Sequence, residues 1–125
     1  MTVDTKGRPI LQGMVRGLLP LYVLQLLAKK HAHGLEIAAS IRAMNNGAWA
    51  PSPGSLYPAL RQLERDGLID GQWEATERAP RRVYRLSRKG RTDMARIRVD
   101  LVGELRVAKL VIDVHLKALT EGDAP

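Results

Sequence analysis

A long helical pattern at the C-terminal end of the chain most constrains its fold. Between Ser87 and Leu119, apolar residues recur at helical spacing, at Met94, Ile97, Leu101, Leu105, Ala108, Ile112, Leu116 and Leu119. A helix of roughly 32 residues is ~48 Å long, and further valines and leucines lie outside this apolar stripe. We therefore predict a C-terminal dimerisation helix over residues 88–120, which a second copy of the chain covers. The alternative is a helix that packs within its own chain.

Two helical patterns occupy the N-terminal part of the chain. Apolar residues from Ile10 to Leu18 recur at helical spacing and indicate a short first segment. Pro20 suits the first turn of a helix, where its missing N–H does no harm. The apolar run that follows predicts a buried helix that ends at Lys29 and Lys30, whose charges suit a helix C-terminus.

Two more helices are predicted between His33 and Asp66. One begins near His33 and is stopped by the Asn-Asn-Gly sequence at residues 45–47. The next begins at Ser52-Pro53, a favourable N-cap followed by proline in the first helical position, and ends near Asp66 before Gly67. Its buried face is expected to hold Leu56, Ala59, Leu60 and Leu63.

After Gly67 the sequence pattern changes from helix to strand. Residues 68–75 and 81–86 indicate two short strands, and the loop between them has the length of a hairpin connection. On the second strand, Tyr84 and Leu86 are expected to face the core. The predicted fold is α+β and mostly helical, a winged helix-turn-helix of three helices and a two-stranded wing over residues 10–87. Residues 1–9 and 121–125 are expected to be flexible termini.

The distribution of charge points to a polyanionic partner. The formal net charge is +7, and residues 78–98 contain nine basic residues against one acidic residue, a local net charge of +8. A localised basic patch beside a predicted hairpin favours nucleic acid over a merely basic surface. We expect double-stranded DNA as the partner.

The third helix carries the side chains expected to read DNA. In a helix-turn-helix, the second helix of the pair enters the major groove and its N-terminal residues meet bases and phosphates. Hydroxyl groups suit phosphate, arginine suits guanine and glutamine suits adenine. The predicted contacts of this helix are Ser52, Ser55, Tyr57, Pro58, Arg61 and Gln62. Arg65, which lies between two acidic residues, is expected to be solvated.

Basic residues around the hairpin are expected to contact the DNA backbone. Such contacts supply affinity and salt dependence more than sequence information. The predicted contacts of the wing and its flank are Arg78, Arg81, Arg82 and Lys89.

Three sequence blocks resemble the PadR family of bacterial transcriptional regulators. The first is His-Gly-Leu-Glu-Ile at residues 33–37, where Leu35 stands in a position that is often aromatic. The second begins with Ser-Pro-Gly-Ser-Leu-Tyr-Pro-Ala-Leu at residues 52–60 and continues through Leu-Glu-Arg-Asp-Gly-Leu-Ile at 63–69. The third is Arg-Arg-Val-Tyr-Arg-Leu-Ser at residues 81–87, with Gly90. The resemblance covers about residues 16–91.

This resemblance implies more than the residues show by themselves. It implies a homodimer joined through the C-terminal helix with help from the N-terminal one, and the expected interface is Leu18, Met94, Ile97, Leu101, Leu105, Ala108 and Ile112. It also implies a repressor that binds a pseudo-palindromic operator and that a small-molecule effector can release. The single C-terminal helix resembles the shorter subgroup of the family, so no effector residues are carried over.

Other classes of function find little support in the sequence. The chain has no cysteine, which excludes disulfides and thiolate zinc sites. His31 and His33 suit capping or packing better than metal binding, and Trp49 and Trp73 suit packing better than ligand stacking. No catalytic motif stands out, so we expect no enzyme, no cofactor and no metal. No uncharged apolar stretch reaches the length of a membrane span, and a cytoplasmic protein is expected. The alternative function is a winged-helix adaptor that binds proteins without reading DNA.

Overall fold

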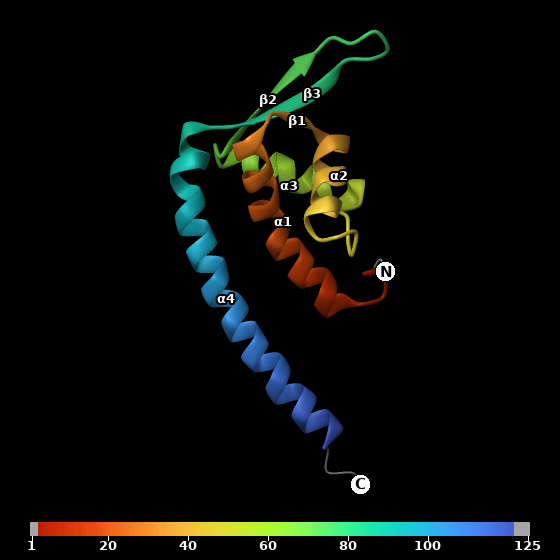
Figure 1. The fold of residues 1–125 in the computed structure, drawn as a ribbon, viewed down its shortest axis with the longest axis vertical. Helices are drawn as coiled ribbons and strands as arrows, with labels where there is room; N and C mark the ends of the chain where they lie inside the picture. The colour runs from red at the N-terminus through yellow and green to blue at the C-terminus, as the bar shows by residue number, and fades with distance from the viewer. Residues whose placement is uncertain (1–2, 122–125) are drawn as a thin grey trace. The chain divides into compact units, whose positions relative to one another are not determined.

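A computed structural model describes residues 3–121 of the chain, and the predictions for residues 1–2 and 122–125 lie outside the described part. The elements are α1 (Pro9–Lys29), β1 (Ala32–His33), α2 (Gly34–Met44), α3 (Pro53–Arg65), β2 (Ile69–Glu74), β3 (Arg81–Leu86) and α4 (Arg88–Thr120) (Figure 1). This order confirms the predicted fold class. The chain divides into two compact units between Met94 and Ala95.

The first helix corrects the prediction of two N-terminal segments. α1 is one helix of 21 residues, and Pro20 lies in its interior. Proline removes one backbone hydrogen bond there, yet the helix continues because its apolar side chains pack into the core. The buried residues of α1 are Leu19, Val23, Leu24, Leu26 and Leu27. By length and composition α1 is also apolar enough to cross a membrane, but these buried side chains make it the core helix of the first unit.

The start of α2 assigns a role to His33. Its ring Nδ1 accepts a hydrogen bond from the backbone N–H of Glu36 at 3.4 Å, and a Glu36 carboxylate oxygen accepts one from the His33 N–H at 3.2 Å. The latter hydrogen bond lowers the pKa of Glu36. This reciprocal capping box confirms that His33 is a capping residue.

The sheet has one strand more than the sequence predicted. Its three antiparallel strands follow the order β1-β3-β2, and β1 pairs Ala32 with Tyr84. A two-residue strand has too short a pattern to be recognised before the fold brings it against β3. Within the β2–β3 hairpin, Ile69 lies opposite Leu86 and Trp73 lies opposite Arg82.

The hydrophobic core of the first unit lies among α1, α2, α3 and the sheet. The largest fully buried side chains come from all four parts and are Leu19, Val23, Leu24, Ile37, Ile41, Leu60 and Ile69. On α3, Leu56, Leu60 and Leu63 are buried as predicted, whereas Ala59 is only half-buried. Tyr84 is buried as predicted and Leu86 is half-buried. Val83, on the opposite face of β3, is buried too.

The beginning of α4 is fastened to the end of α3. The hydroxyl of Ser87 donates to the carbonyl of Gly67 at 2.6 Å and accepts from the N–H of Gly90 at 2.9 Å, so Ser87 caps the start of α4. Gly90 is buried, and a Cβ there would collide with the backbone carbonyl of Leu68. A close approach of two backbones therefore requires glycine at position 90.

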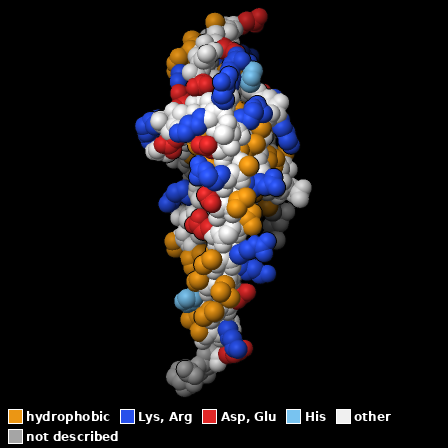
Figure 2. Space-filling model, turned by 90° about the vertical axis from the view of Figure 1, so that its left-hand side faces the viewer, with side chains coloured by type: hydrophobic (Ala, Val, Ile, Leu, Met, Phe, Trp, Pro, Cys, Tyr) orange, Lys and Arg blue, Asp and Glu red, His pale blue; other side chains and the backbone are white. Residues whose placement is uncertain are grey.

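The second unit consists of the remainder of α4, whose apolar side chains form two stripes. The predicted interface positions Ile97, Leu101, Leu105, Ala108 and Ile112 are half-buried. A second stripe is exposed to solvent and holds Val99, Val107, Leu110 and Val114, with Val102 and Val111 beside it. At 100° per residue these stripes lie on opposite sides of the helix. Hydrophobic side chains gather in patches over this part of the surface, with basic and acidic side chains beside them (Figure 2).

Candidate nucleic-acid interface

The exposed face of α3 displays the residues predicted to read DNA. All six predicted contacts on this helix are exposed, namely Ser52, Ser55, Tyr57, Pro58, Arg61 and Gln62. The centre of the exposed face runs along Gly54, Pro58, Arg61 and Arg65, which follow helical spacing opposite the buried leucines. Arg65 therefore belongs to this face. Arg65 is exposed to solvent, as the sequence predicted, and its guanidinium donates to the Gln62 side-chain oxygen.

Arg61 and Gln62 differ in how they are held. The guanidinium of Arg61 forms no hydrogen bond or ion pair within residues 3–121. The amide of Gln62 donates to Asp66 at 2.9 Å and accepts from Arg65 at 2.8 Å. These two hydrogen bonds set the orientation of the Gln62 amide. One amide hydrogen and one oxygen lone pair remain available, as a donor and an acceptor that face solvent.

The N-terminus of α3 has no side-chain cap. Ser52 occupies the N-cap position as predicted, but its hydroxyl donates to the hydroxyl of Ser55 at 3.2 Å, and its oxygen accepts no hydrogen bond from the helix backbone. Pro53 has no N–H to cap. The backbone N–H groups of Ser55 and Leu56 donate to the Ser52 carbonyl, so the two hydroxyl groups and the N–H of Gly54 are presented together at an exposed helix end, where the helix dipole favours negative charge.

Tyr57 has a packing role in addition to the predicted one. Its ring lies against the first turn of α2, and a Cβ on Gly34 would be only 2.8 Å from the Tyr57 hydroxyl oxygen. Gly34 is buried, while 39% of Tyr57 remains exposed. Tyr57 thus fixes the spacing of α2 and α3 on one edge of the exposed α3 face.

In the folded chain, some basic side chains of the cluster at residues 78–98 form a hydrogen bond or an ion pair, and others do not. Arg85 lies 3.6 Å from Glu74, and Arg96 lies 3.7 Å from Asp100. The ammonium of Lys89 donates to the backbone carbonyl of Asp66 at 2.8 Å, where it meets the negative end of the α3 dipole. Within the described residues, the side chains without such a partner are Arg78, Arg81, Arg88, Arg91 and Arg98.

Arg82 is the most firmly held member of the cluster. Two of its nitrogens donate to the carboxylate of Glu64 on α3, at 2.7 and 3.2 Å. Its guanidinium also lies 5.7 Å from the ring centroid of Trp73 and 5.9 Å from that of Tyr84, within the range of cation–π attraction. The hydrogen bond to Glu64 raises the pKa of Arg82 further above its usual range. Arg82 therefore ties the wing to α3, and its charge is already balanced.

Arg78 and Arg81 lie where the wing meets solvent. Arg78 belongs to the loop between β2 and β3, which Thr76 closes with a hydrogen bond from its hydroxyl to the carbonyl of Ala79 at 2.6 Å. Arg81 begins β3, and both arginines are exposed. The wing thus carries two exposed positive charges at its outer end, of which Arg81 also acts electrostatically on the carboxylate of Glu36 and helps to lower its pKa. Among the described residues, no cluster of three or more His, Cys, Asp or Glu side chains could hold a metal ion.

Three helices followed by a hairpin, with an exposed and uncapped third helix, define the winged helix class of fold. Residues 23–96 match the family described as "Transcriptional regulator PadR-like family". The chain belongs to this family, and it is a transcription regulator.

Known relatives agree with this assignment. The chain is 33% identical over 76 residues to the transcriptional regulator Rv3488 of Mycobacterium tuberculosis, a match that covers 61% of this chain and 68% of the relative. A PadR family transcriptional regulator from Eggerthella lenta has a TM-score of 0.67 at 26% identity, covering 86% of this chain and 97% of the other. A transcriptional regulator from Clostridium thermocellum has a TM-score of 0.64 at 26% identity, covering 79% and 93%.

Proposed function

We propose that this protein binds double-stranded DNA sequence-specifically as a homodimer and represses transcription in the cytoplasm. The observation that carries the proposal is the exposed α3 face, where the unpaired guanidinium of Arg61 stands beside the oriented amide of Gln62. Both groups can form paired hydrogen bonds with base edges in the major groove. We propose that α3 enters that groove and that no catalytic reaction is involved.

Backbone contacts support this orientation. The start of α3, which has no side-chain cap, offers the N–H of Gly54 and the hydroxyls of Ser52 and Ser55 to a phosphate. Arg78 and Arg81 extend from the wing toward the flanking backbone or minor groove in this proposal. Arg82 and Lys89, although predicted as contacts, act in our proposal through the protein because Glu64 and the Asp66 carbonyl already bind them.

We further propose that α4 joins two copies of the chain. The proposed interface keeps Leu18, Met94, Ile97, Leu101, Leu105, Ala108 and Ile112 and adds the exposed stripe of Val99, Val107, Leu110 and Val114. Exposed apolar side chains along such a helix are stabilised when another helix covers them. A two-fold dimer presents two α3 helices, so the operator should be a pseudo-palindrome with half-sites about one helical turn or a multiple apart.

Footprinting on the promoter beside the protein's own gene would test this function. We expect protection of two inverted half-sites, and a duplex of that sequence should bind at least about 1,000-fold more tightly than a scrambled duplex. Equal affinity for both duplexes at fixed salt would exclude sequence-specific binding and would favour a protein-binding adaptor.

A further inference from the structure

The wing carries an exposed tryptophan in addition to its arginines. The sequence led us to expect packing for Trp73, yet 68% of this residue is exposed. One side of its ring lies against the guanidinium of Arg82, which is 5.7 Å from the ring centroid. Because tryptophan is highly buried on average and is enriched at interfaces, the uncovered remainder of the ring indicates a contact surface.

The register of the hairpin places Trp73 on the face of the wing that is turned toward α3. Trp73 lies opposite Arg82, and the side chains of directly opposed residues share one face of a sheet. The guanidinium of Arg82 reaches the carboxylate of Glu64 on α3 at 2.7 Å. Trp73 therefore stands on the α3 side of the wing, beside the ion pair that joins the two elements.

Trp73 also lies between the two parts of the protein that are proposed to touch DNA. Glu64 and Tyr57 are seven residues apart, so they share one edge of the exposed α3 face. Arg78 and Arg81 lie on the far side, where the hairpin extends beyond α1, α2 and α3 (Figure 1). DNA is stiff over such a short length, so a duplex that contacts α3 and both arginines passes over the segment between them. The sugar–phosphate backbone that borders the major groove is then the part of the DNA nearest to the Trp73 ring.

The chemistry of the indole suits that backbone. Each nucleotide offers the apolar C–H surface of its deoxyribose and phosphate oxygens that accept hydrogen bonds. The indole of Trp73 offers an apolar ring and one N–H donor, and this N–H has no partner within residues 3–121. The cation beside the ring is already paired with Glu64. Trp73 is thus suited to a contact that contributes affinity without neutralising a phosphate.

We propose that Trp73 contacts DNA directly, by laying its exposed ring on a deoxyribose of the backbone beside the half-site. The inference rests on the proposed function for its partner, double-stranded DNA, but not for sequence specificity. Every nucleotide presents the same sugar, so the ring contacts any duplex that α3 and the wing hold. Arg82 and Trp73 then differ in role, since Arg82 fixes the angle of the wing and Trp73 touches the DNA.

The fluorescence of Trp73 reports this contact. Trp49→Phe leaves Trp73 as the sole tryptophan of the chain, with circular dichroism to show that the variant is folded. We expect the operator duplex to lower acrylamide quenching of Trp73 saturably, with the midpoint that anisotropy of a labelled duplex gives. Binding by anisotropy with unchanged acrylamide quenching would overturn the proposal. Protection of Trp73 that rises with protein concentration in the absence of DNA would assign the ring to a second copy of the chain and would overturn it too.

Trp73→Ala in the otherwise unchanged chain measures the contribution of the ring. We expect operator affinity to fall at least about fivefold, as it does for truncated tryptophan anchors at interfaces. The slope of log affinity against log salt should stay unchanged, because the indole releases no counterion. Trp73→Phe keeps an aromatic body and should retain most of the affinity.

Gln72→Ala is the matched control for this loss. Gln72 is exposed and adjacent to Trp73, but its side chain lies on the opposite face of β2. We expect this variant to bind like the parent protein. A loss in Trp73→Ala no greater than that of Gln72→Ala, or a reduced salt slope in Trp73→Ala, would overturn the proposal.

A double-variant cycle with Glu64 separates direct contact from support of Arg82. Glu64→Gln already weakens the ion pair, so a tryptophan that only supports Arg82 has little left to support in that background. We expect Trp73→Ala to weaken operator binding by a similar factor in the Glu64→Gln background and in the parent. Absence of a further loss would show that Trp73 acts through Arg82 and would overturn the direct contact.

A scrambled duplex separates this inference from the proposed function. We expect both the operator and, at higher concentration, the scrambled duplex to protect Trp73 from acrylamide. Equal affinity for the two duplexes, with Trp73 protected in both, would contradict sequence-specific binding and leave the inference standing. Tighter binding of the operator, with Trp73 unprotected in both complexes, would overturn the inference alone. Failure of both duplexes to bind would contradict the inference and the proposed function together.

Discussion

Arg82 on β3 and Glu64 on α3 form a two-point ion pair that joins the wing to the proposed recognition helix. The distances are 2.7 and 3.2 Å, and the side chains are 30% and 26% exposed. Gly71 makes room for this pair, because a Cβ at that position would lie 2.5 Å from the Arg82 Nε. The sequence pattern suggested Arg82 for phosphate binding; because Glu64 on α3 already holds its guanidinium, we propose that Arg82 positions the wing instead.

Glu64→Gln tests whether Glu64 affects DNA binding by positioning the wing or only through its negative charge. The substitution removes a negative charge near DNA and frees Arg82, so electrostatics alone would strengthen binding. We expect the opposite, an operator affinity weaker by about threefold to tenfold, because the wing loses its fixed angle to α3. Anisotropy titration at fixed salt measures this, and Arg82→Gln should produce a similar loss. A tighter complex in Glu64→Gln would show that the pair does not position the wing.

Arg61→Ala tests direct reading of bases. Loss of a paired contact should cost about 1–3 kcal/mol on the operator and much less on a scrambled duplex. Loss of a cation that lies off the α3 face, such as Arg42, could also weaken DNA binding through charge alone. Lys29→Ala, which removes a cation at the end of α1, controls for this effect. If Arg61→Ala weakens both duplexes equally, Arg61 contacts phosphate and not bases.

The salt dependence of binding separates the arginines of the wing. Arg78→Gln and Arg81→Gln should each reduce the slope of log affinity against log salt by about 0.9 for every phosphate contact that is lost. Arg82→Gln should leave that slope unchanged because Glu64 already neutralises its charge. If all three variants and the parent protein show the same slope, the wing does not contact the DNA backbone as proposed.

Charges introduced on the two faces of α4 test the dimer. Leu105→Glu with Ile112→Glu probes the half-buried stripe, and Leu110→Glu with Val114→Glu probes the exposed one. We expect light scattering to give the mass of one chain for at least one pair, since an unpaired buried charge strongly destabilises an interface. Replacement of the exposed Lys109 by Glu controls for charge alone. A dimer that survives both double variants would exclude α4 as the interface.

Gly90→Ala should destabilise the first unit severely. The added methyl group would meet the Leu68 carbonyl, which is backbone and cannot move aside cheaply. We expect a loss of more than about 2 kcal/mol in urea unfolding, as for other overpacked sites. Gly17→Ala is the matched control in a helix, since nothing lies within 4 Å of a Cβ there. That control should gain about 0.5–1 kcal/mol from helix propensity; equal effects at both positions would contradict the close approach.

The sequence alone determined the features that depend on local patterns. The buried leucines of α3, the cap at Ser87 and the long α4 follow from side-chain period and capping chemistry, which act within a few residues. The exposed residues of α3 could be predicted for the same reason, because the core face of a helix also defines its opposite face.

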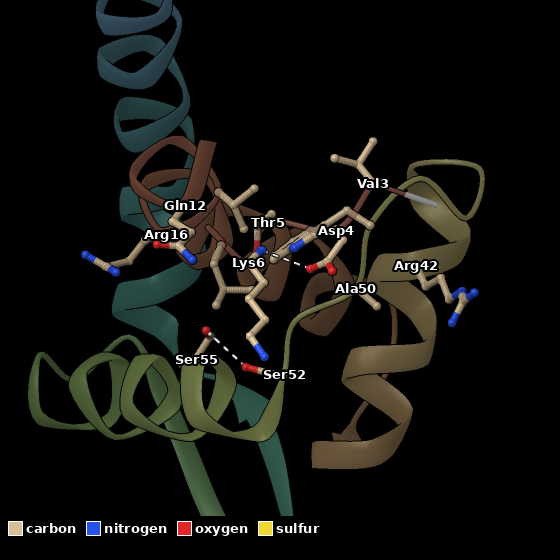
Figure 3. Close-up of a pocket in the computed structure, with 13 residues that line it drawn as sticks. Val3, Asp4, Thr5, Lys6, Gln12, Arg16, Arg42, Ala50, Ser52 and Ser55 are labelled. Carbon is tan, nitrogen blue, oxygen red and sulfur yellow. Dashed lines mark hydrogen bonds between the residues drawn. The ribbon is translucent and has the colours of Figure 1, made fainter. Parts of the chain in front are cut away.

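Only the tertiary structure decided how distant residues pair. The continuation of α1 through Pro20 depends on packing against the rest of the core, and β1 exists because β3 lies beside it. The pairing of Arg82 with Glu64 joins residues 18 positions apart, and no periodicity in one segment reports on such a contact. A cavity beside Trp49 is lined by residues of five separate segments, namely the N-terminal arm, α1, α2, the loop before α3 and α3 (Figure 3). Its lining therefore forms only when these segments are folded together. Local rules therefore determine which side chains are exposed, and the fold determines which exposed charges stay available to a partner.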